Sequence, residues 1–257
     1  MLEVKNITKI YNPGTVTEMK LFDGFNLDVE DGEFVSVIGS NGSGKTSLLN
    51  IICGSIPIDK GDVLIGGESI AKEADFVRCR RLGRVYQNPA LGTSPNLTML
   101  ENLSLADNKG KPFGLSFGVN KKRIPYYTEQ LASLGLGLED KLGVKMGSLS
   151  GGQRQAVALL MATMTPLKFL ILDEHTAALD PKTAEIIMEL TDKVVREKAL
   201  TAIMVTHNLR YAVEYGTRLI MMDRGGIVLD KRGEEKATLT TEEVLAQFNR
   251  ISIECGN

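Results

Sequence analysis

The chain lacks several features that mark other classes of protein. Its 257 residues include only three cysteines, at positions 53, 79 and 255, which are scattered and odd in number. They form neither a disulfide framework nor a zinc-binding spacing, and this usage is typical of a reducing cytosol. No apolar run approaches the roughly 18 residues of a membrane span, and the charged N-terminus is unlike a signal peptide. We therefore expect a soluble protein that reaches a membrane only through a partner.

Neither sign of charge dominates the sequence. The chain has 30 basic and 32 acidic side chains and a formal net charge of −2. This balance gives no reason to expect nucleic acid or an acidic membrane surface as a partner. Internal repeats and low-complexity segments are also absent. A hydrophobic content of 43% is enough for one large α/β domain with a subdomain.

The strongest motif is a glycine-rich stretch at residues 39–47, which fits G-x-x-x-x-G-K-[ST]. The apolar run at 33–38 predicts a strand before it, and the spacing at 46–53 predicts a helix after it. This context is the one that a phosphate-binding loop requires. The glycines let backbone N–H groups face a phosphate, and the helix N-terminus adds partial positive charge. We expect nucleotide contacts from Gly39, Ser40, Asn41, Gly42, Ser43, Gly44, Lys45, Thr46 and Ser47.

Two side chains of this loop have expected chemical roles. Lys45 would reach the β- and γ-phosphates, and Thr46 would offer its hydroxyl group to Mg²⁺. The alternative is a glycine-rich turn that matches the motif by chance. The predicted strand and helix on either side argue against that alternative.

Two acids follow a predicted buried strand later in the chain. The run at 169–172 is apolar, and Asp173 and Glu174 come directly after it. Such a strand places a carboxylate near Mg²⁺ in ATPases with this kind of loop. We expect Asp173 to act on the metal, directly or through water, and Glu174 to polarise the attacking water. A solvated acidic turn is the alternative.

A second anion-binding helix end is predicted at residues 149–153, which read Leu-Ser-Gly-Gly-Gln. Ser150 can cap the helix, while Gly151 and Gly152 leave backbone N–H groups bare. Two phosphate-binding helix ends cannot easily serve one nucleotide within a monomer. We therefore expect a two-fold dimer in which each nucleotide lies between the loop of one chain and this segment of the other. An ordinary capped helix is the alternative.

The order of the predicted elements gives the fold class. Strands are expected at 2–7, 25–29, 33–38, 62–65, 84–86, 168–172, 202–206, 218–222 and 226–230. Helices are expected at 46–53, 98–106, 124–134, 151–165, 181–198, 208–215 and 241–250, with an exposed loop at 109–122. Residues 2–7 read as an edge strand, and the short turn between 25–29 and 33–38 predicts an antiparallel pair. The alternation of strands and helices predicts a parallel sheet covered on both faces.

These elements predict an α/β fold: a P-loop NTPase with a parallel sheet core, an N-terminal antiparallel β subdomain and an inserted α-helical subdomain. The core is expected to comprise residues 1–87 and 167–230, and the helical insertion residues 88–166. Residues 231–257 would form a C-terminal helix and tail. Ligand groups should gather at the carboxyl ends of the parallel strands.

Taken together, the motifs closely resemble those of the ATP-binding cassette family, the nucleotide-binding subunits of ABC transporters. The resemblance covers nearly the whole chain, from about residue 2 to residue 250. Walker A corresponds to residues 39–47, the signature to 149–153 and Walker B to 169–174. The loop glutamine matches Gln87, the D-loop 178–180 and the switch histidine His207.

The resemblance implies further roles. Tyr11 would stack on the adenine of ATP, with a core tyrosine at a strand end as the alternative. Gln87 would contact Mg²⁺ or the attacking water and report to the membrane partner. His207 would contact the γ-phosphate and hold Glu174 in line, and Asp180 would contact the phosphate loop of the opposite subunit. The implied catalytic residues are Glu174, His207, Gln87 and Lys45, the metal-site residues are Thr46, Gln87 and Asp173, and the signature contacts are Ser150, Gly151, Gly152 and Gln153.

One position departs from the family pattern. The family usually has Asp-Glu-Pro-Thr where this chain has Asp-Glu-His-Thr at residues 173–176. Under the simpler interpretation, His175 is tolerated in the loop in place of the stiffening proline. Under the alternative, its protonation near neutral pH tunes hydrolysis, and the pH–rate profile would then change in His175→Pro.

The predicted function is an ATP-binding and ATP-hydrolysing subunit of a multi-subunit ABC transporter, with ATP and Mg²⁺ as ligands. A bacterial importer of a small organic solute such as an amino acid is favoured. Expected partners are a second copy or a related ATPase subunit, a transmembrane permease and an extracellular solute-binding protein, but not nucleic acid. The expected location is cytoplasmic, peripheral on the inner face of the cell membrane.

Two alternatives stay open. The first is an exporter or lipoprotein-release ATPase, which would use the same motifs. The second is a soluble cassette that acts on ribosomes or in DNA repair. The single cassette, the near-neutral charge and the absence of sustained heptads count against the second.

Overall fold

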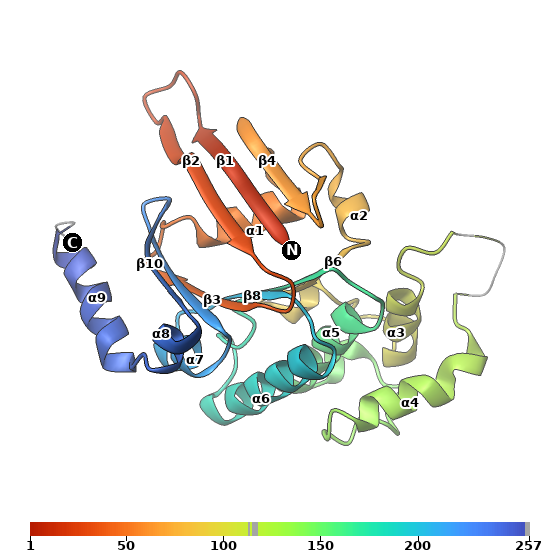
Figure 1. The fold of residues 1–257 in the computed structure, drawn as a ribbon. Helices are drawn as coiled ribbons and strands as arrows, with labels where there is room; N and C mark the ends of the chain where they lie inside the picture. Colours follow the sequence, from red (N-terminus) through yellow and green to blue (C-terminus); the bar gives the residue numbers. More distant parts are fainter. Residues whose placement is uncertain (113, 115–117, 255–257) are drawn as a thin grey trace.

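Two β-sheets and a set of helices form the fold in the computed structural model (Figure 1). The structure describes residues 1–112, 114 and 118–254. The exposed loop predicted at 109–122 and the predicted C-terminal tail therefore lie partly outside the described residues.

The larger sheet has six strands in the order β10-β9-β3-β8-β7-β6. β3 pairs in parallel with β8 and β9, β7 pairs in parallel with β6 and β8, and β10 is antiparallel at one edge. Its inner strands are apolar almost throughout because both faces of the sheet are covered. The strands are β3 (Phe34–Gly39), β6 (Leu82–Val85), β7 (Phe169–Asp173), β8 (Ala202–Val205), β9 (Arg218–Asp223) and β10 (Gly226–Arg232).

A smaller antiparallel sheet has the strand order β2-β1-β4-β5. Its strands are β1 (Leu2–Tyr11), β2 (Met19–Val29), β4 (Lys60–Ile65) and β5 (Glu68–Ser69). Residues 2–7 were expected at an edge, and this expectation is wrong, because β1 pairs with both β2 and β4.

The predicted antiparallel pairing of residues 25–29 with 33–38 is also wrong, because these segments belong to different sheets. β2 alternates between buried and exposed residues toward its end, whereas all six residues of β3 are buried. A strand buried on both faces belongs in the covered parallel sheet, and an alternating strand belongs in a sheet with one solvated face. The short turn between them therefore passes the chain from one sheet to the other.

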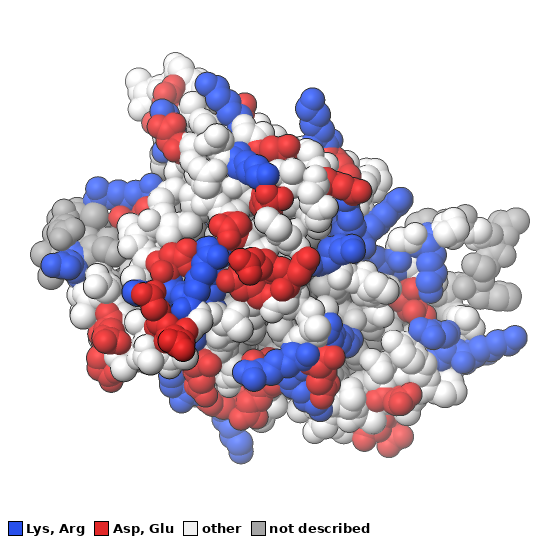
Figure 2. Space-filling model, in the orientation of Figure 1, with Lys and Arg blue, Asp and Glu red and all other residues white. Residues whose placement is uncertain are grey.

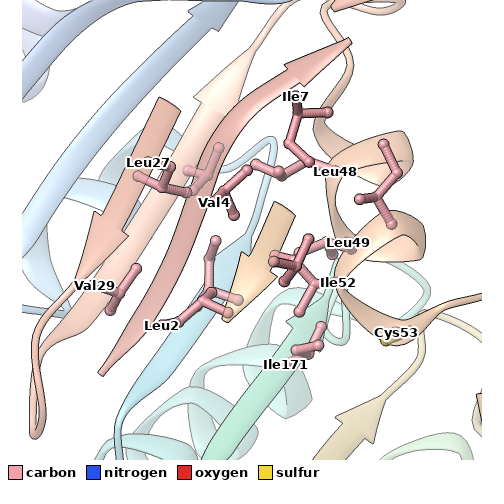
Figure 3. Packing of buried hydrophobic residues seen from close by; sticks show 14 of the residues in the cluster. Leu2, Val4, Ile7, Leu27, Val29, Leu48, Leu49, Ile52, Cys53 and Ile171 are labelled. Atoms are coloured by element: carbon pink, nitrogen blue, oxygen red, sulfur yellow. The ribbon is translucent and has the colours of Figure 1, made fainter. Parts of the chain in front are cut away.

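Helix α1 (Lys45–Cys53) lies between the two sheets (Figure 1). The prediction that the parallel sheet is covered on both faces is confirmed, and on this face the cover consists of α1 and the antiparallel sheet. Figure 3 shows the resulting core, in which side chains of β1, β2, α1 and β7 meet. Those labelled there are Leu2, Val4, Ile7, Leu27, Val29, Leu48, Leu49, Ile52, Cys53 and Ile171.

Helices cover the opposite face of the parallel sheet (Figure 1). A second apolar cluster joins them to β6, β7 and β8. α5 (Gly151–Thr163) and α6 (Pro181–Glu197) lie against the sheet, whereas α3 (Met99–Asp107) packs against α5 and α4 (Ile124–Ala132) packs against α3. The described part of residues 88–166 contains helices and no named strand, while its delimitation as a subdomain stays a prediction.

Four further α-helices belong to the described residues. They are α2 (Asp75–Arg78), α7 (Leu209–Glu214), α8 (Gly233–Ala237) and α9 (Thr241–Glu254). None of the helices in the described ranges is both long and apolar enough to span a membrane.

Charged side chains of both signs are interspersed over the face shown in Figure 2.

Arg218 of β9, although almost fully buried, ties the two sheets together. Its guanidinium group donates to both carboxylate oxygens of Asp230, over 2.7 and 2.6 Å, and to the carbonyl oxygen of Asp28 in β2, over 2.6 Å. The buried charge is thus paired and hydrogen-bonded, as a buried arginine requires.

The turn between β9 and β10 packs tightly against β2. At Gly225 the angle φ is +75°, and a Cβ atom would overlap the carbonyl oxygen of Leu21. Only glycine fits such a position. The N–H group of Gly225 donates to the carbonyl oxygen of Ser43 over 3.0 Å, so this turn also supports the loop at 39–47.

We expect Gly225→Ala to destabilise the protein more than Gly32→Ala. Gly32 has a similar φ of +78° but open space around it, so both variants bear the cost of a positive φ and only Gly225→Ala forces β2 to move. The free energy of unfolding should fall by about 2 kcal/mol more in Gly225→Ala. Urea denaturation of both variants measures this difference, and equal losses would contradict the packing argument.

Candidate functional site

A pocket of about 320 Å³ opens where β3, β7 and β8 end. The carboxyl ends of parallel strands are where an α/β sheet places its ligands. The structure brings together here the predicted aromatic residue, most of the phosphate loop, the predicted base and the predicted switch histidine. The lining residues are Tyr11, Met19, Leu21, Asn41, Gly42, Gly44, Lys45, Thr46, Ser47, Glu174 and His207.

Close packing explains two of the loop glycines. At Gly39 a Cβ atom would overlap the carbonyl oxygen of Met222, and at Gly44 it would lie 2.9 Å from the Phe22 ring. Gly44 also has φ of +101° and forms the cap of α1. The loop is therefore held between β9 and β2, with the N-terminus of α1 directed at the pocket.

Lys45 lies inside the loop. Its ammonium group donates to the carbonyl oxygens of Gly39 and Ser40, over 2.7 and 2.8 Å, and to the hydroxyl oxygen of Ser43, over 3.3 Å. Burial lowers the pKa of Lys45, and the carboxylate of Glu174 acts in the opposite direction. A phosphate bound in this loop would meet the preplaced ammonium group of Lys45 and the backbone N–H groups of the loop. The loop therefore fits a nucleoside triphosphate.

Tyr11 closes one side of the pocket at the end of β1. Its hydroxyl group lies 3.4 Å from the hydroxyl oxygen of Ser47, and its ring packs against the core between the sheets. The apolar side chains of Met19 and Leu21 lie in the same lining. A flat base would therefore meet an aromatic ring and apolar surface there.

Glu174 and His207 form the polar side of the pocket. His207 Nε2 lies 2.5 Å from Glu174 Oε1, and the backbone N–H group of Glu174 donates to the carbonyl oxygen of Val205 over 2.9 Å. Glu174 has φ of +48°, a left-handed conformation that is uncommon for a residue with a side chain. The resemblance implies a contact between these two side chains, in which His207 would hold the proposed base in line.

Arg84 of β6 holds the predicted metal ligand Asp173. Its Nη2 group donates to Asp173 Oδ2 over 2.6 Å, and its Nη1 group donates to Asn50 Oδ1 in α1 over 2.9 Å. The guanidinium group also lies over the Tyr86 ring, 4.6 Å from the ring centroid. Sequence reasoning missed Arg84, for which the signal was an arginine within a short apolar strand that leads to Gln87.

The residues present fit Mg²⁺ as an expected ligand. Thr46 offers a hydroxyl group in the pocket lining, whereas the carboxylate of Asp173 and the amide of Gln87 lie outside that lining. Oxygen donors of these kinds suit Mg²⁺. No cluster of three His, Cys, Asp or Glu side chains in the described ranges could hold a metal ion by itself. Mg²⁺ would thus depend on phosphate oxygens and water for its other ligands.

The signature residues lie outside this pocket. Ser150 Oγ accepts from the backbone N–H of Gln153 over 3.2 Å, and Gln153 Oε1 accepts from the N–H of Ser150 over 3.2 Å, which confirms the predicted cap. At Gly152 a Cβ atom would overlap the side chain of Thr183. Packing within the chain itself is therefore enough to require glycine at this position. The separation from the pocket is the arrangement that a shared nucleotide site would need.

The pocket lining also leaves out Gln87, Asp173 and Asp180, together with Gly39, Ser40 and Ser43 of the loop. Gln87 is exposed after the end of β6. Asp180 caps α6, accepting from the N–H of Thr183 over 3.1 Å, and hydrogen bonding by the side chain and the backbone of Thr183 lowers the pKa of Asp180. Gln155, which sequence reasoning missed, donates from α5 to the carbonyl oxygen of Tyr86 over 3.0 Å. It joins the signature helix to the segment that carries Gln87.

His175 is a core residue with 2% of its surface exposed. Its Nε2 atom lies 3.0 Å from Thr191 Oγ1 of α6, and burial lowers its pKa to about 4. The imidazole ring is therefore uncharged at neutral pH. The hypothesis that its protonation near neutral pH tunes hydrolysis is wrong, because the buried ring cannot accept a proton there without a large cost.

The fold and the pocket define a P-loop nucleoside triphosphatase. The family profile described as ABC transporter matches residues 22–177. The chain belongs to this family and is an ATP-binding, ATP-hydrolysing subunit of an ABC transporter.

Two relatives match over nearly their whole length. The tyrosine transport ATP-binding protein of Clostridioides difficile is 47% identical over 252 residues, covering 96% of this chain and 98% of the relative. The xylose/arabinose import ATP-binding protein XylG of Sulfolobus acidocaldarius is 32% identical over 258 residues, covering 100% of this chain and 98% of the relative.

Solved structures agree with the family. A dimeric ATP-binding cassette in a post-hydrolysis state, bound to ADP and phosphate, matches with a TM-score of 0.76 and 32% identity, covering 90% of this chain and 98% of the other. The CbiO1 protein of Clostridium perfringens, part of the CbiONQ transporter complex, matches with a TM-score of 0.76 and 25% identity, covering 96% and 94%.

Because His175 is buried, the free energy of unfolding depends on pH. His175 has a pKa of about 4 in the folded protein and an ordinary value of 6.5. Stability is therefore full above pH 6.5 and is lost as the pH falls from 6.5 toward 4, because only the unfolded chain binds the proton readily. Between pH 7 and pH 5 this group should remove about 2 kcal/mol from the free energy of unfolding.

His175→Gln keeps a polar side chain without this titration. Urea denaturation of wild type and of His175→Gln at pH 7 and pH 5 measures the difference. The variant should lose less stability than the wild type by the stated amount. The same acid loss in both proteins would contradict the assignment.

Proposed function

We propose that this chain is the ATPase subunit of a bacterial importer for an amino acid or a similar small organic solute. The observation that carries the proposal is the 47% identity to a tyrosine transport ATP-binding protein over almost the whole of both chains. The name of a more distant relative refers to import of sugars, so the class of solute is argued from the nearer match.

Two copies would close on two ATP molecules. Ser150 and the glycines after it lie outside the pocket of their own chain, although they form a capped, anion-binding helix end. Each ATP would lie between residues 39–47 of one copy and residues 150–153 of the other, with Asp180 against the opposite loop. The similarity to a dimeric cassette bound to ADP and phosphate supports this arrangement.

Within each site, Glu174 would take a proton from the attacking water, and His207 would hold its carboxylate in line while contacting the γ-phosphate. Lys45 would stabilise the negative charge on the β- and γ-phosphates, as preplaced cations do in phosphoryl transfer. Thr46, Asp173 and Gln87 would hold Mg²⁺, which supplies further charge neutralisation. Tyr11 would stack on the base.

Closing and opening of the dimer would drive a separate permease through the surface around Gln87. The similarity to CbiO1, which belongs to a transporter complex, supports a membrane partner. The chain would then lie at the cytoplasmic face of the cell membrane. An importer would add an extracellular solute-binding protein.

Replacing Glu174 by glutamine should separate ATP binding from hydrolysis. The amide cannot accept the proton, so we expect the hydrolysis rate to fall at least about 100-fold while ATP binding persists. Trapped ATP should hold the closed dimer, which size-exclusion chromatography detects. Glu242→Gln, on the exposed side of α9, is the control and should hydrolyse ATP normally. A wild-type rate in Glu174→Gln would show that another group is the base.

The partner proteins test the importer assignment. We expect a tagged chain, purified from detergent-solubilised membranes of the source cell, to carry along a multi-span permease and an extracellular binding protein. That binding protein should melt at a higher temperature with tyrosine or another amino acid. A permease without a binding protein would contradict import, and recovery of ribosomal proteins or DNA instead would contradict transport. Untagged cells are the control.

A further inference from the structure

We propose that His175 is a positioning residue, whose hydrogen bond to Thr191 fixes the segment from Glu174 to Asp180 and thereby sets the rate of ATP hydrolysis. The proposal rests on the proposed role of Glu174 as the base.

The direction of this hydrogen bond follows from its neighbours. Thr191 Oγ1 lies 2.7 Å from the carbonyl oxygen of Ile187, which can only accept, so the hydroxyl proton is used there. The threonine oxygen therefore accepts from His175, and the proton of the imidazole ring lies on Nε2, 3.0 Å away. The hydrogen bond thus has one defined direction, and the neutral imidazole ring of His175 is the tautomer with its proton on Nε2.

The anchor point is rigid. Thr191 is completely buried in α6, a helix of 17 residues whose apolar face packs into the core on the helical side of the parallel sheet. The imidazole ring is buried as well, so water does not compete for the bond. A hydrogen bond between two buried side chains holds its geometry better than one at the surface.

The anchored segment carries the proposed catalytic geometry. Glu174, directly before His175, has the left-handed φ of +48°, which costs about 1 kcal/mol or more and persists only where the surroundings enforce it. Two turns follow, with hydrogen bonds from Ala177 N to Glu174 O over 2.9 Å and from Leu179 N to Thr176 O over 3.2 Å. Asp180 then caps α6. His175 thus ties down the chain beside the strained residue.

Loss of this tie should change the chemical step and leave ATP binding intact. The proposed contacts to the base and to the phosphates come from Tyr11, the phosphate loop, His207 and residues 150–153 of the other copy, all outside the segment from Glu174 to Asp180. The aim of the Glu174 carboxylate, in contrast, depends on the backbone next to His175. Small misplacements of a catalytic group reduce the rate strongly. The expected signature is therefore a lower kcat with an unchanged dissociation constant for ATP.

Matched pairs of variants test the bond. His175→Leu and Thr191→Val remove it at similar volume, whereas His175→Gln keeps an N–H donor and Thr191→Ser keeps the hydroxyl group. We expect kcat to fall roughly tenfold in His175→Leu and in Thr191→Val, with the Kd for ATP within about twofold of wild type. The glutamine and serine variants should keep most of the rate. The double variant should also lose only about tenfold, because both changes break the same bond.

Rates are compared well below the melting temperature of the least stable variant, so that a loss of stability alone does not lower kcat. Wild-type kcat in the folded His175→Leu and Thr191→Val variants, or losses that multiply to about 100-fold in the double variant, would overturn the proposal. The Glu174→Gln variant distinguishes a failure of the proposed base from a failure of the proposed role of His175. If that variant hydrolyses ATP normally, the proposed base is wrong; if it is inactive and the cycle shows no coupling, only the role of His175 is wrong.

Discussion

The confinement of the phosphate loop between two sheets is the constraint on which the rest of the structure depends. Gly39 meets the backbone of β9, Gly44 meets the Phe22 ring of β2, and the turn at Gly225 fills the space between them. With the loop fixed in this way, Lys45 turns inward and α1 starts at the pocket. The antiparallel sheet is thus part of the nucleotide site, because it presses the loop into shape and supplies Tyr11.

The guanidinium group of Arg84 lies next to Asp173, a residue of the proposed metal site. Arg84 pairs with Asp173 and with Asn50, so it joins three elements: the strand that leads to Gln87, the strand that ends in Asp173, and the helix that follows the phosphate loop. A carboxylate that is only slightly exposed would be costly without a partner. The arginine therefore stabilises the carboxylate of Asp173 by pairing with its Oδ2 atom.

The sequence predicted the local parts of the site well and the long-range parts poorly. The fixed spacing of residues 39–47 encodes a strand, a turn and a helix by itself, and Ser150 and Gln153 encode a cap within four residues. The separation of β2 from β3, the pairing of Arg84 with Asp173 and the burial of His175 all depend on which elements meet in space. A short turn looks the same whether it joins two strands of one sheet or passes between sheets. A histidine in a turn likewise gives no sign that Thr191, in the middle of the next helix, lies beside it.

The contact between Gly152 and Thr183 has a mechanical consequence. Because Gly152 has no side chain, the side chain of Thr183 packs directly against the start of α5, and a Cβ atom at position 152 would overlap it. In a dimer of the proposed kind, the end of α5 would face one ATP molecule, while α6 follows directly from the segment that holds the base for the other. Each subunit would then connect two ATP molecules through the packed starts of α5 and α6.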